Sequence, residues 1–136
     1  MKAFLIVVPL AFLALIVLAA GYVRLAPSHQ EDWHVDPTDA SIATGFSRFL
    51  VRADGDLNSP RYELASEDLL AKFQQIALQN PRTRQLFGQV ETGRLTFRSR
   101  SALWGFPDYT TVEVLDLGGG RSALVIFARS RFGKDN

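Results

Sequence analysis

Arginine side chains at alternating positions of two predicted strands are the residues of this chain best suited to chemistry. Arg98 and Arg100 share one face of a strand, because successive side chains of a strand point to opposite faces. Arg129 and Arg131 share one face of a second strand in the same way. A guanidinium offers a planar fork of N–H donors that matches a carboxylate or a phosphate. The first hypothesis is therefore an anion-binding site on the face of a sheet.

Two acidic residues give these arginines a structural alternative. Glu113 lies on the strand predicted between the two arginine strands, and Asp108 lies beside the start of that strand. Opposite charges on adjacent strands stabilise a sheet, so the arginines could serve only in an ion-pair network with these two carboxylates. On that interpretation Glu113→Gln destabilises the domain by about 1 to 3 kcal/mol, the cost of leaving a partner unpaired. Both interpretations stay open.

Other patterns that resemble reactive motifs are weaker. The Gly118–Gly120 run lacks the spacing of a nucleotide-binding loop and leads into no helix, so we expect a hairpin turn. The residues His29, Asp32, His34 and Asp36 are irregularly spaced, and we expect a solvated linker rather than metal ligands. The chain has no cysteine, so a Ser-His-Asp or similar arrangement would need this histidine segment folded into the domain. We expect no cofactor, metal or catalytic residue, and an enzyme of unknown reaction is the third hypothesis.

Aromatic residues are interleaved with arginines between positions 97 and 109, a pattern that can stack on single-stranded nucleic acid. The formal net charge is only +1, and the apolar N-terminal segment described next is typical of export or anchoring. We therefore expect no nucleic-acid partner. Acidic residues predominate between positions 27 and 70 and basic residues after position 71, so the two halves can neutralise each other in the fold.

The N-terminus contains a long apolar run. Ala3 to Val23 carries no charged residue, and as a helix it would be about 30 Å long, the thickness of the hydrocarbon core of a bilayer. Tyr22 and Arg24 are residues that favour the membrane interface. We expect an uncleaved single-span anchor, and a signal peptide cleaved near Ala19 or Ala20 is the alternative.

The charge beside this run predicts an orientation. Lys2 precedes it, so the positive-inside rule predicts a cytoplasmic N-terminus and a periplasmic domain at a bacterial inner membrane. The expected partners are the membrane itself and a lipid or protein held by the arginines. Three parts follow: an anchor over residues 1–24, a juxtamembrane linker over 25–45 and a domain over 46–136.

The fold class predicted for residues 46–136 is α+β, a small antiparallel sheet with one main helix packed on it. The helix begins with Ser66 as N-cap, has apolar residues at three- and four-residue spacing, and ends at Asn80-Pro81. Short strands are predicted over residues 49–52 and 61–64, and longer ones over 94–104, 109–116 and 122–131. Trp33 is the one large apolar residue of the linker, and we expect it to dock on the domain or on the bilayer surface.

Several segments resemble domain-of-unknown-function family 1499. Members carry a Gly-Phe-x-Asp segment followed by a Val-Glu strand, and an Arg-Ser-x-Ser-Arg-x-Gly segment, the second of which is shortened here. The matching residues are Gly105, Phe106, Asp108, Val112 and Glu113, then Arg129, Ser130, Arg131 and Gly133. The segments 22–28, 33–37, 80–83 and 98–109 are also similar, the first two to membrane-anchored alphaproteobacterial members.

The resemblance implies a fold without implying a reaction, because the family has no agreed activity. Its members continue past the last glycine into a closing helix, whereas this chain ends at Lys134-Asp135-Asn136. We therefore expect one face of the sheet to be partly exposed, along with any site that the closing helix would complete.

Overall fold

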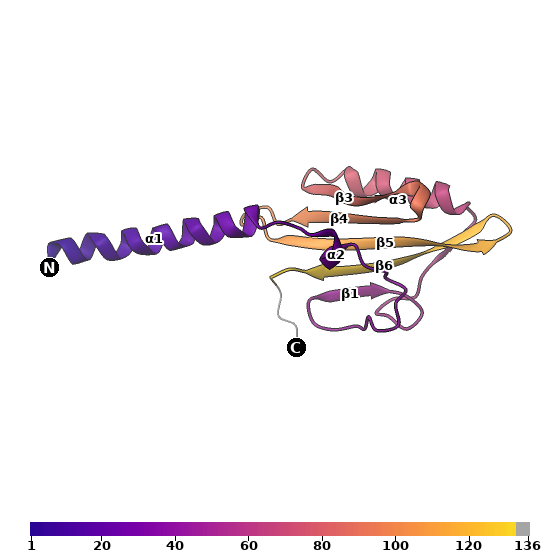
Figure 1. The fold of residues 1–136 in the computed structure, drawn as a ribbon, viewed down its shortest axis with the longest axis horizontal. Helices are drawn as coiled ribbons and strands as arrows, with labels where there is room; N and C mark the ends of the chain where they lie inside the picture. Colours follow the sequence, from indigo (N-terminus) through magenta and orange to yellow (C-terminus); the bar gives the residue numbers. More distant parts are fainter. Residues whose placement is uncertain (133–136) are drawn as a thin grey trace.

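The computed structural model describes residues 1–132, as an extended helix followed by a sheet with a helix on one face (Figure 1). The elements are α1 (Lys2–Leu25), α2 (Gln30–Trp33), β1 (Arg48–Val51), β2 (Arg61–Tyr62), α3 (Ser66–Leu78), β3 (Thr83–Gln89), the 3₁₀ turn η1 (Val90–Thr92), β4 (Arg94–Arg100), β5 (Pro107–Gly118) and β6 (Arg121–Ser130). All strand pairs are antiparallel, in the order β1-β6-β5-β4-β3 with β2 also paired to β6. The sheet is open, and the predicted α+β class is confirmed.

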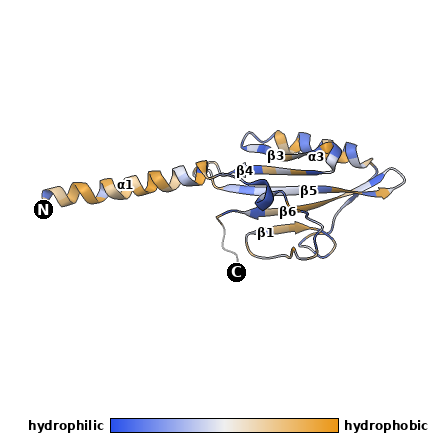
Figure 2. Ribbon diagram, in the orientation of Figure 1, coloured by the Kyte–Doolittle hydropathy of each residue, from blue (hydrophilic) through white to orange (hydrophobic). Residues whose placement is uncertain are grey.

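The apolar run at the N-terminus forms one continuous helix. α1 extends away from the sheet and none of its residues is buried (Figure 1). Hydrophobic residues make up most of its length (Figure 2). By length and composition α1 can cross a membrane.

One face of the sheet and the apolar face of α3 form the core. Leu69 and Leu70 of α3 are buried against Leu95, Phe97 and Val112 of the sheet. The three sheet residues share one face because they stand at alternating positions or directly opposite each other, as the period-two pattern predicted.

The start of α3 differs from the prediction. Ala65 has the extended backbone of an N-cap, and Ser66 is already the first helical residue. Its hydroxyl therefore makes no capping bond, and it is buried without a hydrogen-bond partner within residues 1–132. The predicted Ser66 cap was wrong by one position.

The strands also differ from the prediction: β2 covers only Arg61–Tyr62 of the predicted 61–64, and two differences are larger. β4 ends at Arg100 rather than at position 104, because a turn follows in which Gly105 has a φ of +72°. β3 was not predicted at all. A register shift between Gln85 and Phe87 interrupts its alternation, which removes the period-two signal. The β5–β6 hairpin turn at Gly118–Gly120 is confirmed, and all three glycines there have positive φ.

The other face of the sheet is covered by the chain that follows α1, which we call the arm (residues 26–45). The Trp33 ring stacks on Tyr109 with centroids 3.8 Å apart, and the Trp33 carbonyl accepts a hydrogen bond from Thr111 Oγ1 at 2.9 Å. His34 Nδ1 lies 2.7 Å from Thr96 Oγ1. The arm is thus bound to the domain. Docking of Trp33 is confirmed, whereas the solvated linker expected around His34 is not what the structure shows.

Candidate anion-binding site

A row of four arginines and one tyrosine crosses the arm-covered face of the sheet. Directly opposed positions on successive strands place side chains on one face. In strand order the row consists of Arg48, Arg129, Tyr109, Arg98 and Arg84. β5 separates the two arginine-bearing strands, as predicted, and it contributes Tyr109 to the middle of the row.

Two of the four predicted site arginines hold the arm. Arg129 donates a hydrogen bond to the carbonyl of Asp32, and its guanidinium lies 4.6 Å from the centre of the Trp33 ring. Arg131 Nη1 donates to the carbonyl of Pro27 at 2.8 Å. Because these donors are directed at the arm backbone and at an aromatic face, the contacts described for Arg129 and Arg131 are structural.

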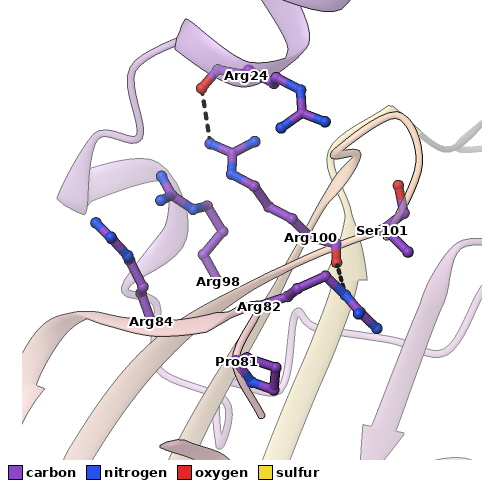
Figure 3. Close-up of a pocket in the computed structure, with 8 residues that line it drawn as sticks. Arg24, Pro81, Arg82, Arg84, Arg98, Arg100 and Ser101 are labelled. Carbon is purple, nitrogen blue, oxygen red and sulfur yellow. Dashed lines mark hydrogen bonds between the residues drawn. The ribbon is translucent and has the colours of Figure 1, made fainter.

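The other two, Arg98 and Arg100, line a cavity of about 280 Å³ at the α1 end of the sheet (Figure 3). We call it the arginine pocket. Its lining consists of Arg24, Pro81, Arg82, Arg84, Arg98, Arg100, Ser101 and Ala102. Five of these eight residues carry a positive charge and none carries a negative one. The pocket is therefore a concentrated site of positive potential.

Arg100 connects the pocket to the end of α1. Its guanidinium donates to the carbonyls of Val23 at 3.2 Å, Arg24 at 2.9 Å and Gly105 at 2.9 Å. A cation at these carbonyls complements the negative C-terminal end of the helix dipole. Burial lowers the pKa of Arg100, and the neighbouring charge of Arg98 lowers it further. The sheet thus fixes the orientation in which α1 leaves the domain.

Arg98 is the least satisfied member of the pocket. Its Nε is buried and has no hydrogen-bond partner within residues 1–132. The nearest residue across the strand pair is another arginine, Arg84, so the register brings like charges together. Figure 3 shows the side chains of Arg84, Arg98 and Arg100 projecting from the same side of the sheet, with Arg100 extending to Arg24 at the end of α1. Such a set of donors is suited to an anionic acceptor.

The carboxylates predicted as ion-pair partners lie elsewhere. Glu113 lies opposite Arg94, whose Nη2 approaches Glu113 Oε2 at 3.2 Å and Asp36 Oδ1 at 3.4 Å. Asp108 lies opposite Ser99 and therefore projects from the other face of the sheet. The predicted network is corrected: Glu113 pairs with Arg94, and the register keeps Asp108 away from the arginine row.

Titratable groups under the arm have shifted pKa values. Burial raises the pKa of Glu113, and a hydrogen bond that the protonated Glu113 carboxyl donates to the Asp36 carboxylate adds to the shift. Hydrogen bonds from Thr38 lower the pKa of Asp36. Burial, followed by the charge of Arg94, lowers the pKa of His34. Docking of the arm therefore favours a neutral His34.

Three of the five pocket arginines were missed from the sequence. Arg82 and Arg84 stand at alternating positions just after α3. This spacing is visible in the sequence, but no strand was predicted there, so the two arginines were not recognised as sharing a face. Arg82 Nε donates to the carbonyl of Arg100 at 3.1 Å. Arg24 enters the pocket from the end of α1 and donates to the carbonyl of Leu103 at 3.2 Å, a contact 79 positions away that no local pattern indicates.

Comparison of the chain with protein-family models, with curated proteins and with solved structures finds no match. Membership of domain-of-unknown-function family 1499 stays a prediction. Gly133 of its second motif and the terminal Lys134–Asn136 lie outside the described residues. Within residues 1–132, no group of three or more His, Cys, Asp or Glu side chains could hold a metal ion.

Proposed function

We propose that the protein is a membrane-anchored binding module whose arginine pocket takes a phosphate-bearing anion at the membrane surface. The observation that carries the proposal is the pocket's composition: five arginines, no acidic lining residue, and a buried Arg98 Nε without a described partner. In this proposal α1 is the membrane anchor, and the domain acts by binding rather than by catalysis.

The number and geometry of the donors favour phosphate as the ligand. A phosphate monoester carries about −1.5 to −2 charges near pH 7 and three strong acceptor oxygens. Guanidinium forks bind such oxygens in pairs. The cavity of about 280 Å³ lies near the lower end of the roughly 300–1,000 Å³ of small-molecule sites. It therefore suits a phosphate with a small substituent.

The position of the pocket favours a ligand from the membrane surface. Arg24 lines the pocket and belongs to the last turn of α1, where the apolar helix ends. With α1 in a bilayer, this turn lies at the headgroup level, where lipid phosphates are found and where basic pockets recognise them.

The proposed location is a bacterial inner membrane, with one span, the N-terminus in the cytoplasm and the domain in the periplasm. Lys2 beside the apolar run supports this orientation. The chain has no cysteine, so a single Glu91→Cys substitution at an exposed position creates a unique labelling site. A membrane-impermeant maleimide should label it in spheroplasts, and the intact mass should include residues 1–24. Labelling only after lysis would reverse the orientation, and a shortened mass would make α1 a signal peptide.

Binding is tested with a soluble probe. The full chain in a non-ionic detergent is titrated with glycerol 3-phosphate in a calorimeter. We expect Arg84→Gln combined with Arg98→Gln to weaken binding at least about a hundredfold, since each charged hydrogen bond contributes roughly 1.5–3 kcal/mol. Arg121→Gln combined with Lys72→Gln, at two exposed positions outside the pocket, is the control of equal charge change. Equal affinities for all three proteins would overturn the proposal.

A structural accessory role without a ligand is the second candidate. It is favoured by the hydrogen bonds that Arg100, Arg129 and Arg131 donate to backbone carbonyls of the arm and of α1. In a structural accessory role, Arg84 and Arg98 bind no ligand. It therefore predicts no measurable binding of glycerol 3-phosphate to the unmodified chain in the same titration.

A further inference from the structure

A second cavity lies beside the arginine pocket, between α1 and the β4–β5 loop (residues 101–106). It has a volume of about 320 Å³. Its lining is apolar and consists of Ile16, Ala19, Ala20, Val23, Trp104 and Phe106. The two alanines leave space on the helix surface, which the two aromatic rings enclose from the other side. We call this cavity the apolar groove.

The groove runs along the part of α1 that would be inside the bilayer. Ile16 and Val23 are seven residues apart, so the groove extends about 10 Å along the helix from its end. Figure 1 shows the loop after β4 lying beside the C-terminal end of α1. Leu103 and Trp104 of this loop are 77% and 48% exposed, and Phe106 is 42% exposed. Exposed aromatic and aliphatic side chains beside an apolar helix are typical of a membrane interface.

One short loop joins the groove to the pocket. Ser101 and Ala102 line the arginine pocket, and Trp104 and Phe106, two and four residues further on, line the groove. Gly105 belongs to the same loop, and because it has no side chain the Arg24 side chain can approach the loop closely. A Cβ at Gly105 would lie 3.0 Å from Arg24 Cζ, and the φ of +72° disfavours any other residue there. The polar and apolar cavities are therefore neighbours on the same helix end.

We propose that the two cavities bind one ligand, an anionic phospholipid, with its phosphate in the arginine pocket and the first part of an acyl chain in the apolar groove. This inference rests on the proposed function and specifies that the phosphate-bearing anion belongs to a membrane lipid. A lipid fits both features because its phosphate and its chain are covalently joined at the depth where the helix leaves the bilayer. In this arrangement the β4–β5 loop inserts into the interface and Trp104 contacts the acyl chain.

Brominated lipids test this contact, because bromine on an acyl chain quenches a tryptophan that touches it. The full chain is reconstituted in phosphatidylcholine vesicles that contain either brominated phosphatidic acid or the same fraction of brominated phosphatidylcholine. Trp104→Phe measures the background from Trp33. We expect Trp104 to be quenched more by brominated phosphatidic acid. Ala20→Phe fills the groove and should abolish that excess, whereas Ala14→Phe, on the same helix outside the groove, should preserve it.

Three results would overturn the inference. They are equal quenching by the two brominated lipids, excess quenching that survives Ala20→Phe, and excess quenching that survives Arg84→Gln combined with Arg98→Gln. The soluble titration separates this failure from failure of the proposed function. If glycerol 3-phosphate still binds in an arginine-dependent way while Trp104 shows no excess quenching, the phosphate site is supported and the assignment of its ligand as a lipid is wrong. If glycerol 3-phosphate does not bind, the proposed function fails first.

Discussion

Replacing Arg98 with methionine should make the unliganded protein more stable while it removes the affinity for phosphate. Nε of Arg98 is buried without a hydrogen-bond partner in the described part of the chain. Burying such a group unpaired costs about 1–3 kcal/mol. Methionine keeps an unbranched apolar stem and removes both the unpaired donor and the charge. If Arg98 served only to stabilise the fold, Arg98→Met would lower the free energy of unfolding instead.

Repulsion within the pocket adds to the expected gain. Arg98 and Arg100 stand two residues apart on the same face of β4, so their backbones are about 7 Å apart. Two unit charges at that separation repel by about 0.6–2.4 kcal/mol for an effective dielectric between 80 and 20. Both side chains are partly exposed, so solvent and salt screen part of this repulsion. We therefore expect Arg98→Met to raise the free energy of unfolding by about 1–3 kcal/mol.

Urea denaturation of the full chain in non-ionic detergent, in a phosphate-free buffer, measures this change. Arg121→Met at the exposed hairpin turn is the control, for which we expect a change within about 0.5 kcal/mol. High salt should reduce the gain seen for Arg98→Met because it screens the repulsion. A loss of stability greater than about 1 kcal/mol in Arg98→Met would refute the reasoning, since it would mean that Arg98 has a structural partner.

Three further predictions concern the arm and the carboxylate beneath it. Trp33→Ala should lower the free energy of unfolding by about 2–4 kcal/mol, because it removes the stack on Tyr109 and a cation–π contact; urea denaturation measures it, and an unchanged midpoint would contradict the docking. The lowered pKa of His34 means that the unfolded chain binds this proton more readily, so stability should fall as the pH drops below 6.5. His34→Asn should flatten this part of the pH profile, and an identical profile would contradict the assignment. Glu113 has a raised pKa, so its stabilising effect is present below pH 4.5 and is lost as the pH rises through the folded value. Glu113→Gln should therefore change stability at pH 7 by less than about 1 kcal/mol. A larger loss would mean that the ion pair with Arg94 stabilises the fold by more than the burial of the Glu113 carboxylate costs.

Local periodicity explains what could be predicted from the sequence. The alternation around Phe97 and Val112 indicated which residues share a strand face, because side-chain direction in a strand depends only on position along it, and the structure places that face under α3. The same rule placed Arg98 and Arg100 together on one face. The glycine run at the β5–β6 turn was predictable because positive φ is a local requirement.

Long-range contacts explain what could not be predicted. Arg100 donates to the carbonyl of Val23, 77 positions away, and no spacing rule connects those residues. The separation of the four predicted arginines into two roles depends on the path of the arm, which covers Arg129 and Arg131 but leaves Arg98 in the pocket. That path follows from tertiary packing of Trp33 rather than from any local pattern.

The central claim, that the arginine pocket holds a phosphate-bearing ligand, is tested most directly by a native mass spectrum of the full-length protein. The protein is extracted from its own membranes in a mild detergent, alongside the variant that carries Arg84→Gln and Arg98→Gln. We predict an added mass that fragments to a phospholipid on the unmodified chain and its loss from the variant. A bare protein in both samples, or a lipid that persists in the variant, would contradict the claim.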